Sequence, residues 1–377
     1  MNAGAPSLFV QAAVSAKPIG VDAFLDDHLD HWWYYGASKV ALRDALATVA
    51  EPGENVLLPS YVPDAVAEAF RELDLDVRYY AIRPDLGVNM ADVERRVDER
   101  TLAIVTVNYF GFPQPTLDEV STYSRDRGYY HIDDNAHAAT SVHDGRLLGT
   151  HGDIGVTSLW KTFPVSDGAL LYLPNADLRR RFEPSALGGA RDRFDRTDLR
   201  YLCKSLLKNL SPTTDAVWKS VATLSEANGA GPTSPTDRYE ESKKPMSKLS
   251  SHVLATVDPL ACRERRRANF RAWLETVGGR RDIHPLYRLL PDGICPQAFP
   301  VVADRPERFI AELSSVGVDS VHTWPRLPSV VDDEPTYETA SFLSRHIVVL
   351  PVHQQLDPEV IRDAGRAILE RPPVEVR

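Results

Sequence analysis

A lysine and an aspartate carry the clearest chemical signal in this sequence of 377 residues. Lys161 ends the stretch Ser-Leu-Trp-Lys at 158–161, and Asp134 lies upstream within His-Ile-Asp-Asp-Asn-Ala-His at 131–137. A lysine amine can form a Schiff base with an aldehyde cofactor, and a carboxylate can keep the ring nitrogen of that cofactor protonated. The pair therefore fits the chemistry of pyridoxal 5'-phosphate (PLP) and indicates an enzyme.

Lys161 can act as a nucleophile only if its surroundings lower its pKa from the ordinary value of about 10.4. Trp160 and Phe163 offer apolar walls that would have this effect. The spacing alone is equally compatible with a surface lysine that follows a strand. The sequence also contains Ser158-x-x-Lys161, which is the first motif of some acyl-transferring serine enzymes. No Lys-Thr-Gly follows downstream to complete the motifs of that class.

Asp134 follows the apolar residues Tyr130 and Ile132, so it is expected at the end of a buried strand. A carboxylate in that place needs a cationic or hydrogen-bonding partner, and a protonated pyridine nitrogen is such a partner. Two alternatives remain open. Asp134 caps a following helix, or its neighbour Asp133 is the working acid.

His137 lies three residues beyond Asp134 and is a candidate to hydrogen-bond or stack on the cofactor, although a lone histidine is more often structural. His131, His137 and His143 follow one another at intervals of six, which is not a usual spacing for metal ligands. The sequence therefore predicts no metal.

A phosphate group needs oriented donors, and the start of a helix supplies them. Gly36-Ala37-Ser38-Lys39 opens the first strong helical pattern, so the backbone amides of 38–40, the Ser38 hydroxyl and the Lys39 ammonium are candidate phosphate ligands. Ser158 is a second hydroxyl candidate. The alternative is a serine N-cap without a ligand.

These candidates depend on an alternation of helices and strands along the first half of the chain. Strand-like runs with helical runs between them favour a mostly parallel sheet covered on both faces, with ligands beyond the carboxyl ends of its strands. Asn108, Asp134 and Lys161 each follow a predicted strand, so we expect all three at one crevice. The predicted strands are 56–59, 76–82, 102–107, 129–132, 156–159 and 169–172, and the predicted helices are 38–50, 64–73, 91–98 and 117–127.

The second half is expected to form a smaller α/β domain, after a loop over 226–248 that is rich in Gly, Pro, Ser and Thr. We place the boundary so that residues 1–245 form the large cofactor-binding domain and 246–377 the small one. The predicted helices here are 249–277 (one helix or two), 305–316 and 358–370, and the predicted strands are 299–302 and 346–350.

Composition limits the classes of protein that the chain can represent. The net charge of −10 opposes non-specific attraction to nucleic acid, and the basic run 263–267 is expected to be a solvated helix face. No apolar run is long enough to span a bilayer, and the first thirty residues lack the pattern of a secretory signal, so we expect the cytoplasm. Cys203, Cys262 and Cys295 are too few and too far apart for a disulfide framework.

Several motifs, taken in order, resemble the DegT/StrS group of PLP-dependent sugar aminotransferases, which are fold-type-I enzymes. The resemblance runs from about residue 34 to 174 and resumes at Met-Ser-Lys-Leu (246–249). The motifs are Val-Leu-Leu-Pro-Ser-Tyr (56–61), Val-Asn-Tyr-Phe-Gly-Phe-Pro (107–113), Ile-Asp-Asp-Asn-Ala-His-Ala (132–138), Leu-Gly-Thr-His-Gly-Asp (148–153), Lys-Thr-Phe-Pro-Val-Ser-Asp-Gly (161–168), Arg-Arg-Ala-Asn-Phe (266–270) and Val-Leu-Pro-Val-His (349–353).

The resemblance implies that Lys161 forms the Schiff base with PLP, that Asp134 pairs with the pyridine nitrogen and that His137 lies beside the ring. It also implies a homodimer with shared active sites, in which the stretch before Met246 reaches toward the neighbour's cofactor phosphate. That stretch is Lys243-Lys244-Pro245 where the family usually has Asn-Tyr-Arg, which makes Lys243 a candidate phosphate ligand.

Two further cofactor-binding candidates occupy positions where this chain departs from the family. Tyr61 lies two residues before Pro63, which replaces a ring-stacking aromatic of the family. Asn108 takes the place of a histidine often found in the strand-end motif.

The function predicted first is transfer of an amino group from an amino acid donor to a ketone or aldehyde, with a keto sugar among the candidates. A second hypothesis keeps PLP but changes the reaction to an elimination, a cyclisation or a related step of specialised metabolism. A third is a non-catalytic protein on the same fold.

Overall fold

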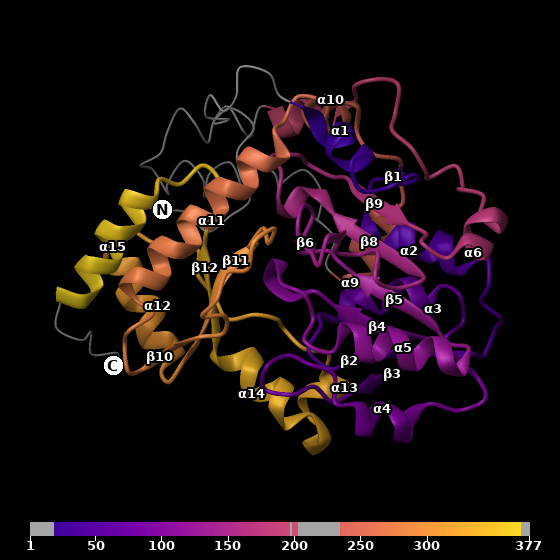
Figure 1. Ribbon diagram of the computed structural model, residues 1–377, viewed down its shortest axis with the longest axis horizontal. Helices are drawn as coiled ribbons and strands as arrows, with labels where there is room; N and C mark the ends of the chain where they lie inside the picture. Colours follow the sequence, from indigo (N-terminus) through magenta and orange to yellow (C-terminus); the bar gives the residue numbers. More distant parts are fainter. Residues whose placement is uncertain (1–18, 197, 203–233, 371–377) are drawn as a thin grey trace.

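The computed structural model describes residues 19–196, 198–202 and 234–370. Two β-sheets organise this part of the chain: a large one built by the first half and a small one built by the second half (Figure 1). Cys203 and residues 226–233 of the predicted loop lie outside the described residues.

The large sheet has seven strands in the order β1-β9-β8-β5-β4-β2-β3. The pairs among β3, β2, β4, β5 and β8 are parallel, whereas β9 pairs antiparallel with both β8 and β1. Every residue of β2, β4 and β8 is buried, as expected for strands covered on both faces, and this confirms the predicted architecture. The strands are β1 Trp33–Tyr35, β2 Asn55–Pro59, β3 Asp76–Tyr80, β4 Thr101–Val107, β5 Tyr130–Asp134, β8 Ile154–Ser158 and β9 Ala169–Tyr172.

Helices connect and cover these strands. Helix α2 (Ser38–Leu46) buries its apolar residues against β8 and β9, which places its first turn above the end of β8. Helix α5 (Leu117–Arg127) packs on β4 and β5 and ends at Gly128, whose φ of 79° is the left-handed conformation that glycine favours at a helix C-terminus. Further helices of this half are α1 Gly20–Asp26, α3 Glu68–Arg71, α4 Met90–Arg96 and α6 Ala176–Arg181.

The small sheet is antiparallel, in the order β10-β11-β12. Figure 1 shows helices α11, α12 and α15 on the side of this sheet that faces away from the large one, and α11 packs along α15. A short hairpin, β6 (Val142–His143) with β7 (Arg146–Leu147), completes the strands. The elements are α10 Lys248–Leu254, α11 Pro259–Thr276, β10 Ile283–Pro285, β11 Ala298–Ala303, α12 Pro306–Ser315, α13 Ser329–Asp332, α14 Glu338–His346, β12 Ile347–Pro351 and α15 Pro358–Glu370.

The stretch 249–277 forms two helices, because Asp258 caps the start of α11 and Pro259 occupies its first position. The prediction of a loop over 226–248 is wrong for Pro235–Ser242, which form helix α9. Ser234 and Asp237 close a capping box there, and this local chemistry stabilises a helix too short and polar to show an apolar period.

The prediction that 263–267 is a solvated helix face is also wrong in part. Arg266 and Arg267 are only 1% and 3% exposed, because α11 turns them toward the loops around the small sheet. No helix among the described residues has the length and apolar character needed to cross a membrane.

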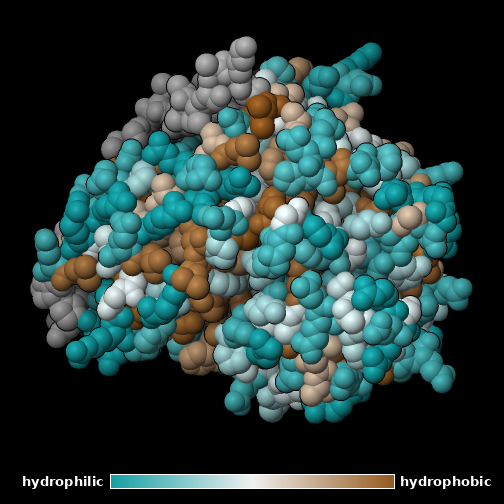
Figure 2. Space-filling model, viewed as in Figure 1, coloured by the Kyte–Doolittle hydropathy of each residue, from teal (hydrophilic) through white to brown (hydrophobic). Residues whose placement is uncertain are grey.

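The two halves meet along the centre of the molecule. Figure 2 shows apolar surface gathered over β11 and β12, on the side where the small sheet approaches the large one. Met246 belongs structurally to both halves, because its backbone bonds to Gly189 and Arg191 while α10 begins two residues later. The division at 245/246 stays a prediction.

Candidate active site

A cavity of about 350 Å³ opens beyond the carboxyl ends of β5 and β8. This is where a parallel sheet presents its ligand site. Six of the candidate residues lie in its wall together: Ser38, Lys39, Asp134, His137, Ser158 and Lys161. Its other lining residues are Ala37, Leu42, Val62, Pro63, Ala65, Val66, Val107, Ala136, Val156, Trp160 and Trp324.

Lys161 lies in a short 3₁₀ turn (Leu159–Lys161) directly after β8, so the sheet carries its backbone to the cavity. Burial lowers the pKa of its amine to about 8, Asp134 acts in the opposite direction and Lys39 adds to the lowering. The amine nitrogen lies 5.9 Å from the ring centre of Trp160. A lysine with this pKa is partly neutral near physiological pH, as a nucleophile requires.

Asp134 is the last residue of β5 and directs its carboxylate into the cavity. It accepts a hydrogen bond of 2.9 Å from the backbone N–H of Ala136. Burial raises the pKa of Asp134, and the nearby charge of Lys161 partly opposes that rise. A buried carboxylate with this little compensation is well placed for a cationic ligand group.

Asp133 serves a different purpose, because successive residues of a strand point to opposite faces. Its two oxygens accept hydrogen bonds from the Asn108 side chain at 2.7 Å and from the backbone N–H groups of Gly149 and His151 at 2.9 and 3.1 Å. Burial nevertheless raises the pKa of Asp133 to about 6. Asp133 thus holds the 149–151 loop behind the site and does not line the cavity.

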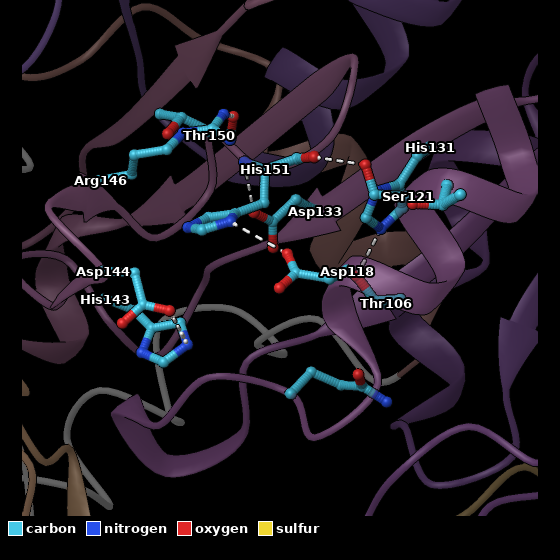
Figure 3. A network of polar contacts seen from close by, with 12 residues as sticks. Thr106, Asp118, Ser121, His131, Asp133, His143, Asp144, Arg146, Thr150 and His151 are labelled. Atoms are coloured by element: carbon cyan, nitrogen blue, oxygen red, sulfur yellow. Dashed lines mark hydrogen bonds and ion pairs between the residues drawn. The ribbon is translucent and has the colours of Figure 1, made fainter.

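Figure 3 shows the polar network around Asp133. His131, on the same strand, bonds through Nε2 to Thr106 at 2.8 Å, and the backbone carbonyl of His151 accepts from Ser121 at 3.0 Å. Burial lowers the pKa of both His131 and His151 to about 4, so both rings are neutral near pH 7. The network ties β4, β5 and α5 together beneath the strand ends.

His137 lines the cavity with a defined tautomer. The backbone N–H of Phe110 donates to its Nδ1 at 3.2 Å, so Nδ1 carries no proton and Nε2 is the remaining donor. Burial lowers the pKa of His137 well below its ordinary value, and Lys161 contributes in the same direction. A neutral ring beside Lys161 is suited to packing against a planar ligand.

Hydroxyl groups from two distant segments meet at one end of the cavity. The Oγ atoms of Ser38 and Ser158 lie 2.9 Å apart at the start of α2. Lys39 also lines the cavity, with its amine 5.3 Å from the ring centre of Tyr239. Two hydroxyls, an ammonium and the first turn of a nine-residue helix form a donor set suited to a phosphate.

Three of the candidate residues do not line the cavity. Tyr61 is fully buried behind Trp324 and donates its hydroxyl to the Trp324 backbone carbonyl. The Asn108 side chain donates a hydrogen bond to Asp133 and accepts one from the backbone N–H of Gln114. The Lys243 amine forms ion pairs of 3.1 and 2.6 Å with Glu72 and Glu240.

A second cavity, of about 240 Å³, adjoins the first and is formed mainly by the small sheet. Lys161, His137, Trp160 and Trp324 line both cavities, so the lysine stands between them. The motifs around Lys161 gave no signal for the residues that the second half contributes, because these converge only through the fold. They are Arg266, Gln297, Ala298, His322, Trp324, Val349, Leu350, Pro351, Val352 and His353.

The first cavity fits PLP in the chemistry of its donors. Asp134 presents a carboxylate in need of a cation, the Ser38–Ser158 pair presents hydroxyls for a phosphate, and Lys161 supplies an amine of lowered pKa. Among the described residues, no cluster of three or more His, Cys, Asp or Glu side chains could hold a metal ion.

The fold is that of the fold-type-I class of PLP-dependent transferases. DesV from S. venezuelae, solved in complex with a ketimine intermediate, has the same fold with a TM-score of 0.66, 18% identity, and coverage of 94% of this chain and 89% of that one. An E coli GDP-4-keto-6-deoxy-D-mannose-3-dehydratase with bound hydrated PLP gives a TM-score of 0.62 and 12% identity, with coverage of 90% and 87%.

Residues 36–200 match the model of the DegT/DnrJ/EryC1/StrS aminotransferase family. The matched range includes Lys161, Asp134, Ser38 and Ser158. The expectation of PLP as the cofactor is confirmed at the level of the family and of its solved neighbours.

Two relatives from Saccharopolyspora spinosa show the range of reactions among similar proteins. A dTDP-4-dehydro-2,3,6-trideoxy-D-glucose 4-aminotransferase is 30% identical over 145 residues, which cover 37% of this chain and 36% of the relative. A dTDP-4-dehydro-2,6-dideoxy-D-glucose 3-dehydratase is 27% identical over 133 residues, with coverage of 35% and 27%. The chain spans about a third of the length of the curated relatives that it matches.

Proposed function

We propose that this protein is a PLP-dependent aminotransferase that moves an amino group from an amino acid donor to a ketone or aldehyde, with a keto sugar as the favoured acceptor. The observation that carries the proposal is the position of Lys161 between two cavities, one with the donor set for PLP and one free for a substrate. The names of the similar proteins favour a sugar as the acceptor.

The candidate residues of the first cavity have distinct roles in this proposal. Asp134 holds a proton on the cofactor's ring nitrogen, His137 packs against the ring, and Ser38, Lys39 and Ser158 bind the phosphate. Bound PLP supplies an electron sink that stabilises a carbanion at the substrate carbon next to the transferred nitrogen. Trp160 and Trp324 limit the access of water to Lys161 from both cavities.

Lys161 does more than attach the cofactor. Once a donor amine has displaced it, its Nζ is a free base of lowered pKa next to the second cavity. Nζ takes the α-proton of the donor in the first half-reaction and donates a proton to the carbon that receives the amino group in the second. The partial compensation by Asp134 keeps the pKa of Lys161 in the range where both steps are possible at neutral pH.

The deciding experiment is a spectroscopic titration of the purified protein with PLP. The wild type should gain the absorption band of a lysine-bound cofactor, whereas Lys161→Ala should bind PLP without that band. With the PLP-loaded wild type, glutamate added alone should yield one equivalent of 2-oxoglutarate per site. A wild type that never acquires the band contradicts the whole proposal.

A second candidate keeps the cofactor and changes the reaction to an elimination or a related step. A similar protein named as a 3-dehydratase supports it. A protein that forms the lysine-bound band, yet releases no 2-oxo acid with any common amino donor, favours this candidate over transamination.

We also propose a homodimer in the cytoplasm, with active sites shared between subunits. The resemblance to the DegT/StrS family supports the dimer. In this arrangement the segment around Lys243 reaches toward the partner's cofactor phosphate, as the same resemblance implies.

A further inference from the structure

Arg266 makes an unusual set of hydrogen bonds for a buried cation. Its side chain is 1% exposed, and all of its acceptors are neutral oxygens from three segments of the chain. Nη2 donates to the carbonyls of Lys161 and Thr162 at 3.3 and 3.0 Å, Nη1 to those of Pro296 and Gln297 at 3.3 Å each, and Nε to Gln354 Oε1 at 3.0 Å.

Stability does not explain this choice of residue. Among the described residues no carboxylate forms an ion pair with Arg266, and an uncompensated charge in the interior costs free energy. What the guanidinium supplies is five N–H donors in one rigid plane, which no other side chain offers. Gln354 adds to the same junction by donating to the Thr162 carbonyl at 2.9 Å.

The three segments that meet at Arg266 have distinct places in the site. Residues 161 and 162 carry the amine between the two cavities, residue 297 lines the second cavity, and residue 354 follows directly after His353 in that wall. The guanidinium therefore joins the main chain of the reactive lysine to the wall of the substrate cavity.

We infer that Arg266 is a positioning residue, which fixes the main chain of Lys161 relative to the second cavity and thereby sets the reach and the basicity of the Lys161 amine. This inference rests on the proposed role of Lys161 in binding PLP. It predicts that loss of the guanidinium moves the lysine, because the hydrogen bonds of Arg266 go to oxygens of the protein, two of them on residues 161 and 162.

Arg266→Lys is the main test, because lysine keeps the charge but has too few donors for all five acceptors. Arg267→Lys is the matched control. Arg267 is the next residue of the same helix and equally buried, but it donates to Pro291, Asp292 and Ile294, away from Lys161. The measurements are the single-turnover rate constant for release of 2-oxoglutarate from glutamate, its dependence on glutamate concentration, and the pH titration of the lysine-bound absorption band in the PLP-loaded protein.

Arg266→Lys should lower the single-turnover rate constant roughly 10- to 100-fold, as expected for a misplaced catalytic group, and should shift the midpoint of the band's pH titration. Arg267→Lys should leave that midpoint unchanged. If Arg266→Lys does not fold, Gln354→Leu takes its place, because it removes one acceptor of Arg266 and the second donor to Thr162. Its effect should be smaller and in the same direction.

The inference is overturned if the variant of Arg266, or of Gln354 in its place, shows the single-turnover rate constant and the titration midpoint of the wild type. Equal shifts in the variants of Arg266 and Arg267 would also overturn it, since they would reflect a general loss of packing in α11. A wild type without the lysine-bound band would instead contradict the proposed function, so the two failures are distinguishable.

Discussion

At the scale of single residues, two adjacent carboxylates at the end of β5 have different roles. Asp134 faces the cavity with one backbone hydrogen bond, while Asp133 faces the other way and satisfies three donors. The sequence left both open as the working acid. The alternation of side chains along the strand separates them, and it does so only once the end of the strand is known.

Replacement of each carboxylate by alanine should therefore have different effects. Asp133→Ala leaves three buried donors without an acceptor and should lower the free energy of unfolding by at least about 2 kcal/mol. Asp134→Ala should leave the apo protein nearly as stable as the wild type, because its carboxylate is itself penalised by burial. It should slow the single turnover of glutamate by the PLP-loaded enzyme by about 100-fold or more. Urea unfolding and single-turnover kinetics measure the two effects, and a stable Asp133→Ala would contradict this assignment.

The lowered pKa of Lys161 predicts the pH dependence of PLP uptake by the apo protein. The amine reacts when it is neutral, so the rate should rise as the pH passes through about 8 instead of through the ordinary lysine range. Asp134 raises that pKa, so in Asp134→Ala the midpoint should move to lower pH. Stopped-flow absorbance between pH 6 and 10 gives both midpoints. An upward shift of the midpoint in the variant would contradict the prediction that Asp134 raises the pKa of Lys161.

At the scale of elements, the alternation of helical and strand-like runs in the sequence predicted β2, β3, β4, β5, β8 and β9 of the large sheet. It thereby also predicted that Asp134 and Lys161 meet at one edge of that sheet. It missed β1 and α9, which are too short to display a period, and their positions depend on pairing with β9 and on a capping box. Trp324 and Arg266 were also missed, because they reach the site from loops and helices of the second half. No local pattern encodes such a meeting.

The start of α2 makes a testable contribution to cofactor binding. Lys39→Met removes an ammonium from the cavity wall and should weaken PLP binding about 10- to 100-fold, while Ser158→Ala removes one hydroxyl and should weaken it about tenfold. Equilibrium dialysis with PLP measures both. Comparable affinity in Lys39→Met and the wild type would place the phosphate elsewhere.

Lys243→Met tests the proposed reach of the segment before Met246 toward the partner's cofactor phosphate. In the chain itself the Lys243 ammonium is bound by Glu72 and Glu240. In the proposed homodimer the variant should bind PLP more weakly, because Lys243 leaves these ion pairs to contact the phosphate. Unchanged affinity in the dimer would contradict that reach.

At the scale of the whole molecule, the site is built where the two sheets approach one another. The first cavity belongs almost entirely to the large sheet and its helices, and the second mainly to the small sheet. The sequence predicted the existence of both sheets but not their contact, which depends on packing between segments more than a hundred residues apart. The identity of the acceptor that we propose for the second cavity is therefore the part of the function least accessible to sequence.

The proposed homodimer leads to a prediction about mass and cofactor retention. Analytical ultracentrifugation of the PLP-loaded protein should give about twice the chain mass of 42.0 kDa. If the subunits share their sites, dilution that separates them should also release PLP, because binding to the assembled form alone couples the two equilibria. A stable monomer that retains its cofactor would contradict shared sites.

The two tryptophans that flank Lys161 give the molecule a built-in optical reporter. Trp160 is 44% exposed and, like Trp324, belongs to the walls of both cavities. Indole fluorescence is quenched when a coloured group that absorbs at its emission wavelengths sits within a few ångströms. Binding and release of PLP can thus be followed as a change in tryptophan fluorescence, without a label. The signal remains measurable in samples too dilute for the visible absorption of the cofactor to be detected.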